Sequence, residues 1–305
     1  MTRPKALPIT EKRNRKSANI DELTTLEIVD LVNSEDMLVP PAVARERKRI
    51  AAAIDLIVER LRKGGRLFYV GAGTSGRLGV LDASECPPTF GVLPSLVQGI
   101  IAGGRRALVR ALEGAEDRAH DGAEAIDARA VKPTDVVVGL AACGMTPYVH
   151  GALKRARQIG AGTVFITCAP EAKKHIPAQI IINPVVGPEV ITGSTRMKAG
   201  TATKLVLNTL TTAAMIKLGK VYGNLMVDLQ ATNEKLRDRS LRIVMELTHL
   251  PRAQAKKLLA RADGKVKPAI VMHYRKVDLR GARNILDHCD QSLRKAMKEK
   301  TASKR

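Results

Sequence analysis

The chain has 305 residues, of which 45% are hydrophobic and only 2% aromatic. This length is enough for one large core or two modest ones, and the composition predicts cores of Ala, Val, Ile and Leu. The formal net charge is +21, and residues 235–305 carry 20 Lys and Arg against 7 Asp and Glu. Because aromatic side chains are nearly missing from that region, we expect a solvated basic face and no specific nucleic-acid binding.

The four cysteines are scattered through the chain, without a C-x-x-C pair or a metal-ligand spacing. This pattern predicts a reducing compartment and no structural zinc. Met1–Lys16 lacks the apolar core of a signal sequence, and no run of 18 apolar residues occurs. We therefore expect a cytoplasmic protein with no membrane partner.

The chain divides by pattern into three regions. Residues 1–45 read as a polar arm with a short amphipathic helix, residues 46–228 as an α/β domain, and residues 229–305 as a basic helical region. Near the first boundary, residues 36–41 predict a break. Residues 42–63 then predict one long helix, because apolar side chains recur at helical spacing until Gly64.

A glycine-rich loop, Gly-Ala-Gly-Thr-Ser-Gly-Arg at residues 71–77, separates an apolar strand from a predicted helix. This order directs backbone N–H groups and a positive helix end at a phosphate. Beside Gly73, Thr74 and Ser75 add hydroxyl donors and Arg77 adds a positive charge. We predict a site for a phosphorylated ligand. The pattern also fits a dinucleotide carrying a 2′-phosphate, or a turn that only packs strand against helix.

Two acidic segments follow the glycine loop. The segment 82–88 ends in Pro87 and Pro88, which predicts that the helix stops near Glu85. After a strand at 96–101, residues 113–117 hold three acids, including Glu116, and are predicted to open a helix, where carboxylates suit the helix dipole.

Further strands are predicted at 135–140, 163–167 and 179–183, alternating with helices. This alternation predicts a doubly wound parallel α/β sheet with helices on both faces. A second small-residue loop, residues 141–147, contains Gly144 and Thr146. Ligands of such sheets bind beyond the carboxyl ends of the strands, where both loops lie.

A third polar cluster precedes a long helix predicted at about 196–218. It contains Glu189, Ser194, Thr195, Arg196 and Lys198. Cations in the first turn of a helix oppose its dipole, which hints at an anionic partner at this helix end. An ordinary capped helix with a basic first turn is the alternative. From Asp228 onward the pattern predicts four short helices and a frayed end from Lys298.

Taken together, these motifs resemble those of the N-acetylmuramic acid 6-phosphate etherase family. The segments that carry the resemblance are 71–77, 82–88, 113–117, 192–201 and 220–228. The resemblance implies a sugar isomerase (SIS) domain, a homodimer with a shared active site, and no metal or other cofactor. It also implies a phosphorylated amino sugar as substrate, whose lactyl ether is cleaved with water to N-acetylglucosamine 6-phosphate and D-lactate in cell-wall sugar recycling.

The resemblance assigns roles to single residues. Glu85 and Glu116 match the catalytic pair, with Glu85 expected as the acid for departing lactate and Glu116 as the base, although the two roles remain open to exchange. Glu189 matches an acidic position of SIS domains and is expected to contact the ligand. One departure lies in the second loop, where the family typically has Ser and Arg but this chain has Cys143 and Met145. A thiol donates more weakly than a hydroxyl, so we expect weaker phosphate binding unless the hydroxyls of the other loops compensate.

Three other functions fit parts of the pattern. A non-catalytic sugar-phosphate-binding regulator, similar to glucokinase regulatory protein, would use the same loops without turnover. A sugar-phosphate isomerase would share the proton abstraction but not the ether cleavage. A nucleic-acid-binding regulator would use the basic C-terminal region, which lacks a convincing helix-turn-helix.

Overall fold

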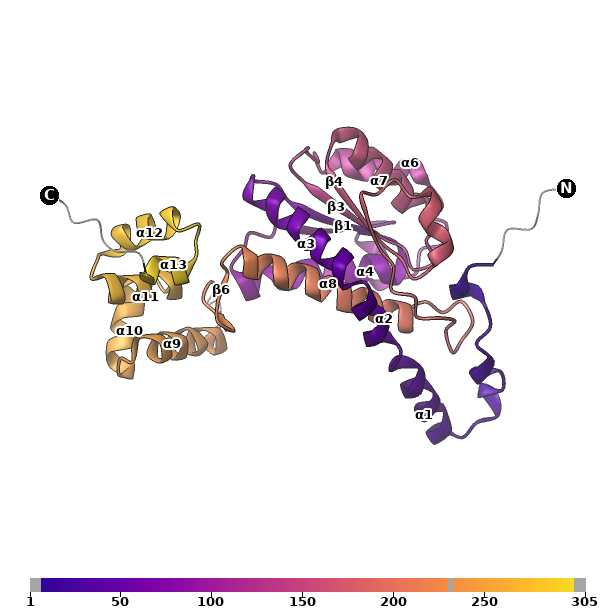
Figure 1. Cartoon of the computed structure of the whole chain (residues 1–305), viewed down its shortest axis with the longest axis horizontal. Coiled ribbons are helices and arrows are strands. Elements are labelled where there is room, and N and C mark those ends of the chain that lie inside the picture. The colour runs from indigo at the N-terminus through magenta and orange to yellow at the C-terminus, as the bar shows by residue number, and fades with distance from the viewer. Residues whose placement is uncertain (1–6, 230–232, 299–305) are drawn as a thin grey trace. The chain divides into compact units, whose positions relative to one another are not determined.

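The computed structural model describes residues 7–229 and 233–298, apart from the side chains of residues 173–175. The chain forms two compact units (Figure 1). The first consists of the residues up to Ser84 together with Ser95–Thr211. The second consists of Glu85–Pro94 together with the residues from Thr212 onward.

Three helices precede the sheet. After short 3-10 turns, α1 (Thr25–Asp36) begins with a capping box in which Thr24 and Glu27 bond each other's backbone. The predicted break at 36–41 is confined to two residues, because Pro40 and Pro41 enter the first turn of α2 (Val39–Arg45). The single helix predicted over 42–63 is wrong in detail: α3 (Arg47–Arg62) is separate from α2.

The first unit is built on five parallel strands in the order β2-β1-β3-β4-β5. Their bounds are Leu67–Gly71 (β1), Val97–Ile101 (β2), Val136–Leu140 (β3), Gly162–Ile166 (β4) and Ile180–Ile182 (β5). The predicted doubly wound parallel sheet is confirmed. The chain reverses its winding direction beside β1, and ligands of such sheets bind at that switch point.

Helices cover both faces of this sheet (Figure 1). On one face, α6 (Ala119–Ala128) and α7 (Pro147–Ile159) pack over Phe68, Val137 and Phe165. The opposite face is covered by α3 and by α4 (Gly73–Phe90), and Gly79 of α4 lies so close to Tyr69 that a Cβ there would approach the tyrosine Cβ to 2.8 Å. Alternating apolar side chains of the strands are therefore buried on both sides.

Two predicted helix boundaries are wrong. The helix α4 does not stop at the double proline but runs through Pro87 and Pro88 to Phe90, so Glu85 lies inside it. Neither proline has an N–H group, so two helical hydrogen bonds are missing from the last turns of α4. Residues 113–117 do not open a helix either. They form a turn before α6 and follow a short helix, α5 (Arg106–Val109), which the pattern did not predict.

The second unit begins with a small antiparallel hairpin, β6 (Val221–Tyr222) and β7 (Leu225–Met226). Helices α9 to α13 follow. They span Glu234–Thr248, Arg252–Arg261, Val266–Arg275, Leu279–His288 and Leu293–Lys298. Four short helices were predicted, and the described residues contain five. Their apolar faces share one core with Val227 and Leu229. The predicted fraying beyond Lys298 lies outside the described residues.

Helices α6 and α7 approach closely because glycine removes the side chains between them. A Cβ on Gly122 would overlap the carbonyl oxygen of Tyr148, and a Cβ on Gly151 would overlap that of Ala119. This contact matters for the site because Glu116 lies just before α6.

We predict that Gly122→Ala and Gly151→Ala each destabilise the protein by about 1–3 kcal/mol, since the added methyl groups must push the two helices apart. Urea unfolding measures the change. Gly200→Ala in α8 (Lys198–Lys217) is the matched control, because a Cβ there meets no atom closer than 3.5 Å. It should be neutral or stabilising by up to about 1 kcal/mol. Equal effects at all three positions would contradict the steric explanation.

Candidate functional site

The first and second predicted loops lie side by side at the carboxyl edge of the sheet. The two loops begin where the neighbouring strands β1 and β3 end, and the last residues of these strands, Gly71 and Leu140, are paired in the sheet. Each loop leads directly into a helix, α4 or α7, whose first N–H groups have no partner within the helix. Two helix N-termini are thus brought to one edge, an arrangement suited to an anion.

The first loop is compact because glycine is required at its contacts. A Cβ on Gly76 would lie 2.6 Å from Cγ1 of Ile101 and 2.8 Å from the carbonyl oxygen of Gly71. Gly73, with φ of 51°, starts α4 in a conformation that other residues rarely adopt. Thr74 and Ser75 occupy the first turn and are half-buried. Their hydroxyl and amide groups are the nearest donors to an anion at this helix end.

Arg77 was predicted to contact a phosphate, but its guanidinium is engaged within the unit. Nε donates to the carbonyl oxygen of Leu108 at 3.0 Å, and one terminal nitrogen donates to that of Arg110 at 3.1 Å. Arg77 therefore holds the segment after α5 against α4.

The second loop is shaped by Gly144 and by a residue that the pattern did not reveal. Gly144 has φ of 76°, and a Cβ there would overlap Ala172. Its carbonyl oxygen lies 2.8 Å from Nε2 of His150, one turn into α7. Thr146 is buried and precedes the first residue of α7. Single-sequence patterns carry no signal for His150, because its role depends on the fold of the loop.

The two departures from the family loop lie beside Gly144. Cys143 is half-buried, and the Met145 side chain is 53% exposed. The exposed thioether leaves this edge without the positive charge that an arginine would bring.

Glu116 is brought to the second loop. Its carbonyl oxygen accepts a hydrogen bond from the Tyr148 amide at 3.0 Å, in the first turn of α7, and its side chain is exposed. Glu85 is also exposed, within α4. Twelve residues of α4 separate it from Gly73, a rise of about 18 Å in an ideal helix. Within one chain, α4 therefore carries this carboxylate away from the glycine loop.

The third cluster differs from the other two because its helix is already capped by an acid. The carboxylate of Glu189 accepts the amides of Lys198 and Ala199, at 3.0 and 2.9 Å, in the first turn of α8 (Lys198–Lys217). Glu189 is fully buried. Burial raises the pKa of its carboxyl group, against the opposing effect of the two amides. In this structure the Glu189 carboxylate binds the backbone of α8, and its predicted contact with a ligand stays a prediction.

Lys198 likewise has its anionic partner inside the unit. Its buried ammonium lies 2.5 Å from Glu35 at the end of α1, and Glu35 also contacts Lys16 at 3.0 Å and Asn14 at 2.8 Å. Burial acts to raise the pKa of Glu35, but the bonds from Lys198, Lys16 and Asn14 outweigh it and lower the pKa. The anionic partner that the basic first turn suggested is therefore Glu35.

The remaining predicted residues lie just before α8. Ser194 and Thr195 are half-buried and Arg196 is exposed. The cluster is close to the first loop, since a Cβ added to Gly200 would lie 3.5 Å from the Thr195 carbonyl oxygen and 3.6 Å from Cγ2 of Thr74. Ser194 and Thr195 can thus extend the hydroxyl-rich surface that Thr74 and Ser75 begin.

Neither a metal site nor a membrane span is found in the described part of the chain. Within residues 7–229 and 233–298, no three His, Cys, Asp or Glu side chains are grouped to hold a metal ion. The helices there are too short or too polar to cross a bilayer.

The strand order and the two loops define a doubly wound domain of the sugar isomerase type. The model of the glucokinase regulatory protein N-terminal SIS domain matches residues 49–157, and that of the C-terminal lid domain of glucokinase regulatory protein matches residues 223–269.

Curated relatives match nearly the whole chain. N-acetylmuramic acid 6-phosphate etherases from Crocosphaera subtropica and Nostoc punctiforme are each 55% identical over 289 residues, covering 95% of this chain and 95% and 94% of theirs. The etherase of a Synechocystis strain is 53% identical, with 95% of each chain covered. The chain belongs to the N-acetylmuramic acid 6-phosphate etherase family.

We predict that Glu35→Gln destabilises the protein by about 3 kcal/mol at neutral pH, because the buried ammonium of Lys198 loses its counter-charge. Urea unfolding at several pH values tests this. The control is Glu59→Gln, which removes an exposed ion pair with Lys63 at 2.6 Å. It should lower the free energy of unfolding by less than about 1 kcal/mol.

The pH dependence gives a second check on the same variant. A lowered pKa in the folded state stabilises at neutral pH, and this contribution is lost as the pH falls through the folded-state pKa. The difference between wild type and Glu35→Gln should therefore shrink in acid, once Glu35 of the wild type is protonated. A difference that stays constant or grows in acid would show that the ion pair does not stabilise the fold.

Proposed function

We propose that this protein cleaves the D-lactyl ether of N-acetylmuramic acid 6-phosphate with water, giving N-acetylglucosamine 6-phosphate and D-lactate. The observation that carries the proposal is 51–55% identity to etherases of that name over about 95% of this chain. The reaction would serve the recycling of cell-wall amino sugar in the cytoplasm.

In this proposal the phosphate binds at the N-termini of α4 and α7. Donors are available from the amides and hydroxyls of Gly73, Thr74 and Ser75 on one side, and from Gly144 and Thr146 on the other. Backbone N–H groups and the two helix dipoles supply most of the attraction, which suits a loop that lacks the usual arginine. Ser194, Thr195 and Arg196 border the same region.

An unactivated ether resists direct displacement, so elimination followed by hydration fits the substrate better. When the sugar ring opens, the hydrogen on the carbon next to the aldehyde becomes acidic. A carboxylate removes it, and the electron pair forms a double bond to the adjacent carbon. The carbon–oxygen bond to lactate breaks there, and a carboxylic acid protonates the departing oxygen. Water then adds to the unsaturated aldehyde, and no redox or metal step is needed.

Glu116 is proposed as the base and Glu85 as the acid. Glu116 is held beside the α7 end of the second loop, where the sugar would lie above its phosphate. Glu85 lies far along α4 from its own glycine loop. A homodimer in which Glu85 of one chain completes the site of the other would resolve this geometry.

Exposed apolar side chains support such a dimer. On α1, the Leu26 side chain is 70% exposed, and Met37, which follows the helix, is 76% exposed. Leu81, one turn before Glu85 on α4, is 44% exposed. Large apolar side chains left exposed on these helices would be shielded from water if a partner covered them.

A non-catalytic sugar-phosphate sensor is the second candidate, because two glucokinase regulatory protein models match this chain. Each match covers only part of the chain, whereas the etherases match nearly all of it. The retained pair Glu85 and Glu116 also favours turnover, since a sensor needs no acid and base.

We predict that the purified protein releases D-lactate from N-acetylmuramic acid 6-phosphate, and that Glu85→Gln and Glu116→Gln each lower kcat by at least about 100-fold, as expected for loss of a general acid or base. Lactate is measured with a coupled dehydrogenase. Glu59→Gln is the control and should keep full activity. Phosphosugar binding by calorimetry without any lactate would overturn the enzyme and favour the sensor.

Mixing the two inactive variants tests the shared site. After exchange of subunits, half of the dimers carry one chain of each kind. If the pair comes from two chains, one of the two sites in such a dimer is intact, and about a quarter of the wild-type activity returns. If the pair lies within one chain, every site lacks one acid and no activity returns.

We further predict that Cys143→Ser lowers the KM for the phosphosugar, because a hydroxyl donates to phosphate more strongly than a thiol. The expected change is a few-fold, corresponding to about 1 kcal/mol. Steady-state kinetics of lactate release measure it, with Cys289→Ser in the second unit as control. An unchanged or higher KM would exclude Cys143 from the phosphate contacts.

A further inference from the structure

The second unit contains a cavity of about 1250 Å³, lined by residues of that unit alone. Seven basic and five acidic side chains line it, an excess of two positive charges, together with an apolar wall. The basic residues are Lys220, Arg237, Arg252, Lys256, Lys265, Lys267 and Arg283. A cavity of this size holds a small metabolite.

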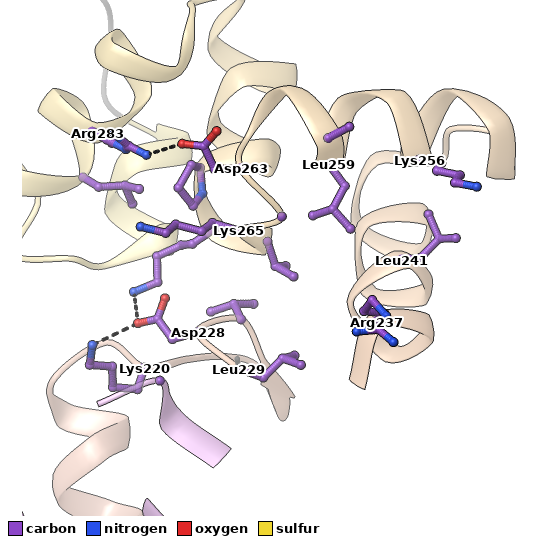
Figure 2. Close-up of a pocket in the computed structure, with 18 of the residues that line it drawn as sticks. Lys220, Asp228, Leu229, Arg237, Leu241, Lys256, Leu259, Asp263, Lys265 and Arg283 are labelled. Atoms are coloured by element: carbon purple, nitrogen blue, oxygen red, sulfur yellow. Dashed lines mark hydrogen bonds and ion pairs between the residues drawn. The ribbon is translucent and has the colours of Figure 1, made fainter. Parts of the chain in front are cut away.

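Two lysines share a single carboxylate oxygen in this cavity (Figure 2). Oδ2 of Asp228 lies 2.7 Å from the ammonium of Lys267 and 3.2 Å from that of Lys220. The Lys267 side chain is only 1% exposed, and its ammonium also donates to the carbonyl oxygen of Gln291 at 2.9 Å. Two positive charges thus face one negative charge, and a buried charge without compensation is costly.

The pKa of Lys267 is lowered, in line with this incomplete compensation of charge. Burial lowers the pKa of its ammonium, and the neighbouring Lys220 lowers it further, while Asp228 acts in the opposite direction. A further anion beside the two lysines would therefore be bound favourably.

The other acids of the cavity are engaged elsewhere. Asp238 pairs with Arg252 at 3.0 Å and Asp263 with Arg283 at 2.7 Å, while Asp287 accepts from the Gln291 amide. Glu234 lies in the first turn of α9, where the helix dipole stabilises its negative charge.

Three cations of the lining remain available. Arg237 on α9, Lys256 on α10 and Lys265 before α11 have no acidic partner among the residues that the structure describes (Figure 2). They add to the positive potential that an anion entering the cavity would experience.

We propose that this cavity binds a small ligand through a phosphate or carboxylate group seated against Lys220 and Lys267. The neutral part of the ligand lies along the apolar wall of Leu229, Leu241 and Leu259. The lining contains neither Glu85 nor Glu116 and none of the proposed phosphate donors, so the site is distinct from the one proposed for ether cleavage. A phosphate and a carboxylate group can each bind the same two ammonium groups, so the experiment uses one probe of each class to distinguish them.

Hydrogen exchange with mass spectrometry on the full chain tests the proposal, because it locates protection along the sequence. Inorganic phosphate and acetate are the two probes, each compared with sodium chloride at equal ionic strength. We expect slower exchange over residues 219–229 and 264–268 with at least one probe. Protection by phosphate alone, or by acetate alone, identifies the class of ligand. No protection of these segments by either probe would overturn the proposal.

Variants separate this site from general charge effects. Lys220→Met should raise the probe concentration needed for half-maximal protection about tenfold, as expected for the loss of a charged hydrogen bond. Lys220→Arg keeps the positive charge and should retain the protection. Lys257→Met, an exposed lysine of α10 outside the lining, should leave it unchanged. Protection unaltered in Lys220→Met would overturn the proposal. Thr74→Ala should affect phosphate protection only in the first unit.

Discussion

The buried ion pair between Lys198 and Glu35 is the interaction on which the organisation of the first unit depends. The two residues are 163 positions apart, at the start of α8 and the end of α1. The amide of Lys198 is bound by a second acid, Glu189. One residue thus joins the N-terminal arm, the segment after β5 and the longest helix. Low-dielectric networks of this kind are stable only when every member is paired, so they fix one arrangement of their parts.

This network also bears on where the proposed phosphate site can lie. Since the carboxylate of Glu189 occupies the N-terminus of α8, the helix ends that remain for a ligand are those of α4 and α7. They lie at the ends of adjacent strands, with Gly71 paired to Leu140. Glu116 is held at the same place by its own backbone, through the amide of Tyr148. Positive helix ends and a carboxylate thus lie at one edge, an arrangement that suits the proton transfer proposed next to a phosphate.

Much of this could be predicted from sequence because the signals are local. Apolar runs followed by glycine loops located the strands and the two loops at their carboxyl ends, and strand–helix alternation predicted the parallel sheet. What could not be predicted depends on distant partners. The basic first turn of α8 suggested an anionic partner, and the pairing of Lys198 with Glu35 could not be identified across 163 residues. Pro87 and Pro88 were expected to end α4, but the helix continues to Phe90 although both prolines lack an N–H group.

The two units treat buried lysines differently, and the contrast shows why only one of them invites a ligand. In the first unit Glu35 also faces two ammonium groups, but that of Lys16 is 62% exposed and stays hydrated. The remaining buried charge, Lys198, is therefore matched by one carboxylate. In the second unit the Lys220 and Lys267 side chains are 23% and 1% exposed around the single oxygen of Asp228. Water compensates the excess charge in the first case, whereas in the second the excess charge borders a cavity that an anion can enter. Around Lys198 the buried ammonium has a carboxylate of its own, whereas around Lys267 one carboxylate oxygen is shared by two ammonium groups beside a cavity with more basic than acidic side chains. This difference in charge balance is why an anion is proposed to bind in the second unit and not at the network around Lys198.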